Sequence, residues 1–109
     1  MLSHVTFRSL DTVSSTFSKK IVSGLLRGDL GFRGLVLTDD LKMAGTTGPR
    51  SVPEASQSAI ESGANMVLIS WGAHAQIGSY RRLSGLFSRD NHLAARAIVP
   101  ILETKQALK

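Results

Sequence analysis

The feature that most constrains the fold of this chain is an alternation between short apolar runs and longer amphipathic segments. Apolar runs within residues 1–7, 34–38 and 65–70 have the length of buried strands, about four to eight residues. Each run is followed, after a polar loop, by a segment with helical periodicity. A β-α-β-α-β-α order requires parallel strands and right-handed crossovers, so we expect an α/β fold with about three βα units.

The helical segments can be recognised from their ends. We expect helices over residues 18–27, 51–63, 77–87 and 93–109. Ser51 and Glu54 have the spacing of a capping box, in which each side chain accepts a hydrogen bond from the main chain of the other. Gly63 then ends that helix. Pro100 should kink or split the last helix, because proline cannot donate a main-chain hydrogen bond.

Length and composition exclude several classes of function. The chain has 109 residues, which fit one domain, and no cysteine, which excludes disulfides, thiolate metal sites and a cysteine nucleophile. No apolar run reaches the roughly 18 residues of a membrane span, and residues 1–10 lack the basic start and apolar core of a secretion signal. The net charge of +5 comes from dispersed basic residues, so we expect solvated helix faces and no nucleic-acid partner. No pattern of metal ligands occurs, so we expect no metal and no cofactor.

Two adjacent carboxylates stand where α/β proteins place their chemistry. The second apolar run ends in Thr38, Asp39 and Asp40, and residues 39–50 have the composition of a long loop. In open α/β sheets and (β/α)8 barrels, ligands bind at the carboxyl ends of the strands. Neighbouring residues at a strand end point in opposite directions, so the two aspartates should not form a facing acid/base pair. The alternative is that they only cap a helix or order the loop.

The residues around this run resemble the signature of glycoside hydrolase family 3, in its bacterial β-N-acetylglucosaminidase branch. The segment LLRGDLGFRGLVLTDDLKM contains two aliphatic residues, an arginine, a spacer, a glycine, three apolar residues, Thr38 and Asp39, in the order of that signature. Lys42 is a minor departure, because the family has a small or polar residue there. Residues 1–5, 51–70 and 93–108 are similar to further segments of the family, so the resemblance covers nearly the whole chain.

This resemblance implies a (β/α)8 TIM barrel of which residues 1–109 would be the C-terminal part. A complete barrel needs roughly 250 residues, so we expect a partial barrel and a truncated catalytic domain. The resemblance also implies that Asp39 is the catalytic nucleophile and that His4 and Met43 bind the sugar. A hydrogen-bonded rim histidine and a packing methionine are the alternative interpretations of these last two residues. Asp40 is expected to be mainly structural.

The function that the resemblance implies is retaining hydrolysis of terminal, non-reducing β-N-acetylglucosamine residues, as in the turnover of peptidoglycan muropeptides. In the family, the general acid/base and the residues that hold the N-acetyl sugar lie upstream of this segment, and their motifs do not occur here. We therefore expect the isolated chain to have little or no activity. The alternative is a non-catalytic remnant that binds sugar or complements the rest of a barrel.

The expected partner is a carbohydrate substrate. Strand edges that further barrel strands would cover are templates for pairing, so we also expect the isolated chain to self-associate. The branch of the family that the chain resembles is bacterial, and a cytoplasmic or exported location would depend on sequence upstream of residue 1.

Overall fold

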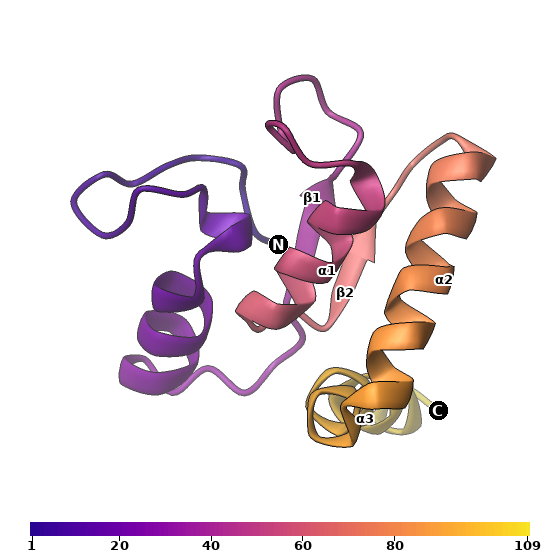
Figure 1. The fold of residues 1–109 in the computed structure, drawn as a ribbon. Coiled ribbons are helices and arrows are strands. Elements are labelled where there is room, and N and C mark those ends of the chain that lie inside the picture. The colour runs from indigo at the N-terminus through magenta and orange to yellow at the C-terminus, as the bar shows by residue number, and fades with distance from the viewer.

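Two parallel strands and the segment around Leu2 form the small sheet that organises this protein. The computed structural model describes residues 1–109. Its elements are η1 (Ser15–Phe17), η2 (Lys20–Asp29), β1 (Leu37–Asp40), α1 (Val52–Ser62), β2 (Met66–Leu68), α2 (Ala73–Arg89) and α3 (Asn91–Ala107), and Figure 1 shows their arrangement. η1 is a single turn of 3-10 helix, and η2 has π-type hydrogen bonding.

β1 lies in the middle of the sheet. On one side it pairs in parallel with β2, with Leu37 opposite Met66. On the other side Leu2 forms a single parallel bridge: its N–H donates to the Leu37 carbonyl at 2.7 Å, and its carbonyl accepts from the Asp39 N–H at 2.9 Å. All three segments run in the same direction, as the alternation of strands and helices predicts.

The expected strand over residues 1–7 is wrong beyond Leu2. The carbonyl of Val5 accepts hydrogen bonds from the Ser15 N–H at 2.9 Å and the Ser15 hydroxyl at 2.8 Å. The Phe7 carbonyl accepts from the Leu10 N–H at 2.8 Å. These groups are satisfied within the loop and are not used for pairing with a strand. The segment therefore leaves the sheet and forms the loop that leads into η1 and η2 (Figure 1).

The caps of α1 are the ones that the sequence indicates. Ser51 Oγ accepts from the Glu54 N–H at 3.3 Å, and Glu54 Oε2 accepts from the Ser51 N–H at 2.8 Å, which completes the capping box. Gly63 ends the helix at a φ of 126°, a conformation that residues with a β-carbon rarely adopt. Among the other helices, α2 begins at Ala73, ahead of the expected residue 77.

Pro100 does not split α3, which continues from Asn91 to Ala107. Proline has no N–H to donate to the carbonyl of Arg96, one turn earlier. Asn65 Nδ2 donates to that carbonyl at 3.3 Å and to the Ala97 carbonyl at 3.2 Å. A side chain next to the sheet thus supplies the hydrogen bond that proline removes, and the expected split of the helix is wrong.

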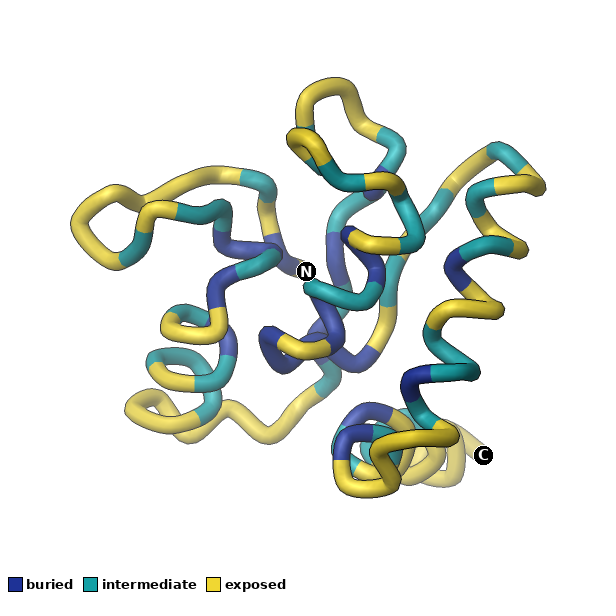
Figure 2. Tube along the Cα trace, viewed as in Figure 1, coloured by how far each residue is buried: buried dark blue, intermediate teal, exposed yellow.

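Helix α1 lies between two small apolar clusters. One cluster joins α1 to the sheet and η2 and consists of Leu2, Val22, Val36, Ala59 and Ala64. The other joins α1 to α2 and α3 and consists of Ile60, Leu86, Leu93 and Ala97. Val67 of β2 packs against both clusters. Figure 2 shows the buried residues concentrated along the segments that face α1 and the sheet, with the loops and outer helix surfaces exposed.

One face of β2 is not covered by a helix. Val67 packs inward, whereas Met66 and Leu68 are 42% and 37% exposed. Parallel sheets normally have both faces covered, so this face has the character of an interface. The structure confirms an α/β arrangement with parallel strands, and the place of that arrangement in a barrel stays a prediction. No helix combines the length and the apolar character that crossing a membrane requires.

Candidate active site

The carboxyl end of β1 is built around an irregularity in the sheet. β1 continues to Asp40, so both aspartates belong to the strand and not to the loop expected from residue 39. The register shifts between Leu37 and Asp40. At the shift, Thr38 Oγ1 accepts from the Leu68 N–H at 3.1 Å, and Asp39 Oδ1 accepts from the Asp40 N–H at 2.7 Å. Two side chains thus take hydrogen bonds that a regular ladder forms between main chains, an arrangement that often re-aims side chains beside functional sites.

Asp39 has one carboxylate oxygen that is held and one that is open. Its main chain is fixed by the hydrogen bond to Leu2, and Oδ1 is fixed by the Asp40 N–H. Oδ2 accepts no hydrogen bond from the protein, and the side chain is half-buried. A carboxylate with this arrangement is oriented and can approach an electrophilic carbon.

Both carboxylate oxygens of Asp40 accept hydrogen bonds. Ser70, which follows β2, donates its hydroxyl to Oδ2 and its N–H to Oδ1 at 3.2 Å, and the Lys42 N–H donates to Oδ1 at 3.0 Å. The Ser70 hydroxyl is the main reason that the pKa of Asp40 lies below its ordinary value, and the Lys42 N–H and the charge of His4 lower it further. Asp40 therefore joins the ends of β1 and β2. The mainly structural role expected of it stays a prediction.

His4 lies beside β1 with both ring nitrogens engaged. Nε2 is 3.1 Å from the carbonyl oxygen of Asp40, which can only accept, so Nε2 carries a proton. Nδ1 is 2.9 Å from Thr16 Oγ1, and that hydroxyl is also 3.0 Å from the Ser3 carbonyl. These contacts are those of a hydrogen-bonded rim histidine. A contact between His4 and a sugar stays a prediction.

Met43 and Trp71 are exposed beyond the ends of β1 and β2. The Met43 N–H donates to the Asp40 carbonyl at 3.2 Å in the turn after β1. Trp71 is 62% exposed, and Lys42 Nζ lies 3.9 Å from the centre of its ring, a cation–π contact. Both side chains are accessible at the end of the sheet that carries Asp39. The role of Met43 in sugar binding stays a prediction.

Asn65, just before β2, is a buried polar residue that the sequence did not single out, and its side chain joins the sheet to η2 and α3. It is only 6% exposed, and its Oδ1 accepts from Arg27 Nη2 at 2.7 Å and from the Val36 N–H at 2.9 Å. Arg27 also donates to the Gly63 carbonyl from Nε and Nη2, at 3.1 and 3.0 Å. Burial and the nearby charge of Arg96 lower the pKa of Arg27. Arg27 is part of the sequence signature, but its partners Gly63 and Asn65 lie 36 and 38 residues further along the chain, so nothing in the sequence indicated the pairing.

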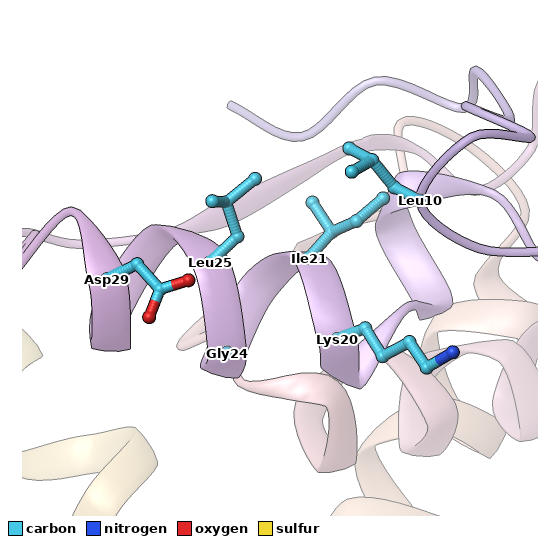
Figure 3. A pocket seen from close by; sticks show the side chains of 6 residues that line it. All are labelled: Leu10, Lys20, Ile21, Gly24, Leu25 and Asp29. Carbon is cyan, nitrogen blue, oxygen red and sulfur yellow. The ribbon is translucent and has the colours of Figure 1, made fainter.

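Three cavities open on the surface, and Asp39 lines none of them. One of about 340 Å³ lies on the outer side of η2, where Ile21 and Leu25 project toward Leu10 (Figure 3). Another of about 450 Å³ lies at the junction of α2 and α3. The third, of about 230 Å³, is lined by His4 and by the loop before α1. No three His, Cys, Asp or Glu side chains cluster as metal ligands would.

The sequence of this chain is similar to a known protein family and to curated relatives. Residues 1–93 match the family model described as the glycosyl hydrolase family 3 N terminal domain. A beta-hexosaminidase of Alkalilimnicola ehrlichii is 38% identical over 69 residues, which are 63% of this chain and 20% of that protein. A beta-hexosaminidase of Neisseria gonorrhoeae is 35% identical over 69 residues, which are 63% of this chain and 19% of that protein. The chain spans about a fifth of the length of these curated relatives.

Solved structures show the same similarity. CbsA from Thermotoga neapolitana superposes with a TM-score of 0.86 at 32% identity, over 98% of this chain and 25% of that chain. The beta-N-acetylhexosaminidase from Beutenbergia cavernae superposes with a TM-score of 0.81 at 33% identity, over 95% of this chain and 32% of that chain. The similarity therefore extends through the described fold, including the end of β1.

Proposed function

The chain belongs to the glycosyl hydrolase family 3 N-terminal domain family, and from this premise we propose that it contributes the catalytic nucleophile of a retaining β-N-acetylhexosaminidase. The substrates are glycosides with a terminal, non-reducing β-N-acetylglucosamine residue, as in peptidoglycan muropeptides. The observation that carries the proposal is the Asp39 carboxylate at the end of β1, held at Oδ1 and open at Oδ2. The names of the relatives support glycoside hydrolysis as the reaction class.

In the proposed mechanism, Asp39 attacks the anomeric carbon of the sugar. Retaining glycosidases use an ionised carboxylate as nucleophile and form a covalent glycosyl-enzyme through an oxocarbenium-like transition state. The bond between the anomeric carbon and the leaving oxygen breaks as the bond to Asp39 Oδ2 forms, and water later releases the sugar. The Asp40 N–H donates to Oδ1 and so orients the carboxylate, which leaves Oδ2 free to attack.

The proposed sugar site extends over the residues beyond the strand ends. Met43 offers an exposed apolar side chain in the turn after β1, and the exposed Trp71 ring has a face that can stack on a pyranose. His4 braces the same end of β1, because its Nε2–H is donated to the Asp40 carbonyl. A sugar bound here would touch apolar surface on one side and polar groups on the other.

The general acid of this proposal lies outside the chain. In retaining enzymes with two carboxyl groups, the groups are about 5–5.5 Å apart, and one protonates the leaving oxygen. Asp40 neighbours Asp39, but both its oxygens are engaged and its lowered pKa favours the ionised form. We therefore expect the 109-residue chain alone to hydrolyse an aryl β-N-acetylglucosaminide at no more than the background rate.

The test of the proposal places the chain in a complete catalytic domain. The corresponding third of the Beutenbergia cavernae enzyme can be replaced by this chain, because 95% of this chain superposes on 32% of that enzyme. The hybrid should hydrolyse an aryl β-N-acetylglucosaminide, and a mechanism-based fluorosugar should label Asp39. Asp39→Asn keeps an acceptor for the Asp40 N–H, and therefore the local fold, and should lower turnover by several orders of magnitude.

Asp40→Asn and Asp29→Asn are the matched controls. Asp29 is exposed at the end of η2, so its substitution should leave turnover unchanged. Asp40→Asn should keep the fold and part of the activity. Labelling of Asp40, or full activity of the Asp39→Asn hybrid, refutes the nucleophile assignment. Asp39-dependent turnover by the isolated chain refutes an external acid and makes His4 the first residue to test as proton donor.

The second candidate function is a non-catalytic remnant that binds sugar or complements the rest of a barrel. The uncovered face of β2, with Met66 and Leu68 exposed, is the observation that favours it. A hybrid that binds N-acetylglucosamine and folds normally but never turns over would support this alternative.

A further inference from the structure

A contact between Lys42 and Trp71 joins the ends of β1 and β2 beside the candidate active site. Trp71 is the single tryptophan of the chain, and its side chain is 62% exposed. Lys42 Nζ lies 3.9 Å from the centre of the indole ring, so the ammonium group covers one face of the ring. The large exposed fraction leaves the other face open to solvent. The ring therefore has one face that is held and one face that can receive a ligand.

Asp40 holds the main chain of both partners in this contact. Its Oδ1 accepts from the Lys42 N–H at 3.0 Å and from the Ser70 N–H at 3.2 Å, and the Ser70 hydroxyl donates to Oδ2. Ser70 directly precedes Trp71 in the chain, so one carboxylate fixes the spacing between the lysine and the tryptophan. The cation–π contact thus forms between two segments that are already attached to each other.

The start of α2 holds the turn that carries Trp71 from its other end. Gly72 has a φ of 91°, in the left-handed region that favours glycine. Gln76 donates its N–H to the Gly72 carbonyl at 3.0 Å and its Nε2 to the Ile69 carbonyl at 2.9 Å. With the turn held at both ends, the freedom that remains is the rotation of the indole side chain. Lys42 is placed to restrict that rotation.

We propose that Lys42 is a positioning residue of the sugar site, which holds the Trp71 ring in the orientation that accepts a pyranose on its free face. The proposal rests on the proposed function, in which the sugar attacked by Asp39 stacks on Trp71. N-acetylglucosamine carries no charge, so the ammonium group acts through the ring and not by pairing with the sugar. A ligand that needs one ring orientation binds more weakly when fewer molecules have that orientation. The energy of an exposed cation–π contact changes this population about two- to fivefold.

The first experiment follows the Trp71 ring in the 109-residue chain without a ligand. Because Trp71 is the only tryptophan, time-resolved fluorescence anisotropy reports the local rotation of this ring alone. Lys42→Met keeps the length of the side chain but removes its charge, and it should increase the amplitude of the fast rotation. Lys42→Arg should preserve the slow motion, since a guanidinium also binds an aromatic face. Lys20→Met, an exposed lysine on η2, is the control and should change nothing.

The second experiment measures sugar binding without turnover. The hybrid with the Beutenbergia cavernae enzyme carries Asp39→Asn, and calorimetry gives its Kd for methyl β-N-acetylglucosaminide. Adding Lys42→Met should raise this Kd about two- to fivefold, whereas Lys42→Arg and Lys20→Met should leave it unchanged. In a Trp71→Ala background, Lys42→Met should have no further effect, because the lysine acts through the ring. Equal melting temperatures by circular dichroism show that the substitutions have not disturbed the fold.

Several results would overturn the proposal. They are an anisotropy decay that Lys42→Met does not change, a Kd that it does not change, an equal effect of Lys42→Met with and without Trp71, and the absence of saturable sugar binding by the hybrid. The nucleophile assignment fails separately, because it is judged by labelling and turnover in the hybrid that retains Asp39. The Kd measured without turnover does not depend on which residue attacks the sugar.

Discussion

Replacing Asn65 with alanine tests the idea that one buried amide joins the sheet, η2 and α3. Its side chain accepts from Arg27 and the Val36 N–H and donates to the Arg96 and Ala97 carbonyls, so all four positions on the amide are used. Asn65→Ala leaves two main-chain groups without this partner, the Val36 N–H and the Arg96 carbonyl that Pro100 cannot serve.

The expected loss of stability is large for a chain of this size. Each buried polar group left unpaired costs roughly 1–3 kcal/mol, so two such groups should lower the free energy of unfolding by about 2–6 kcal/mol. Domains have only about 5–15 kcal/mol of stability in total. Urea unfolding, followed by far-UV circular dichroism, should therefore show a much lower midpoint for Asn65→Ala.

Gln57→Ala is the matched control for this measurement. Gln57 is also an amide with partners at both ends, since it donates to Glu61 at 2.8 Å and accepts from Arg82 at 2.7 Å, but its hydrogen bonds lie at the surface. Water replaces such bonds, so the loss should stay within about 0.5–1 kcal/mol. A loss below about 1 kcal/mol for Asn65→Ala, or equal losses for the two variants, would refute the reasoning.

Three further predictions concern a pH dependence, a turn and an interface. Ser70→Ala removes the main cause of the lowered pKa of Asp40. A carboxyl group with a depressed pKa stabilises the fold above its unfolded pKa of about 3.9, and this contribution is lost as the pH falls through the folded pKa. Urea unfolding measured from pH 7 to 2 should therefore show a smaller loss of stability at acid pH for the variant than for the unsubstituted chain, and equal losses would contradict this. Gly63→Ala places a β-carbon 2.6 Å from Ser23 Oγ at a φ of 126°, so thermal unfolding should show a loss of about 1–3 kcal/mol, and an unchanged Tm would contradict the strain. Size-exclusion chromatography with light scattering should show self-association of the isolated chain, reduced by Leu68→Lys on the uncovered face of β2 but not by Tyr80→Lys on α2; a monomer at all concentrations would contradict it.

Local patterns in the sequence predicted the two ends of α1 and placed the acidic pair at the end of a strand. The capping box of Ser51 and Glu54 and the turn at Gly63 are confirmed, because each depends on residues close together in the chain. The alternation of strands and helices required parallel pairing, and β1 and β2 pair in that way. The placement of Asp39 and Asp40 at a strand end also followed from local sequence, although β1 includes them rather than stopping before them.

Contacts between distant segments were decided only by the tertiary structure. The first strand shrinks to Leu2 because Ser15 takes the Val5 carbonyl, and α3 continues past Pro100 because Asn65 reaches the Arg96 carbonyl. Ser70, 30 residues further along the chain, donates to both carboxylate oxygens of Asp40, whereas Asp39 accepts a hydrogen bond only at Oδ1. The periodicity of a sequence predicts helices and strands, because it follows the repeat of each element. It does not predict these pairings, because hydrogen bonds between separate elements depend on how the elements pack together.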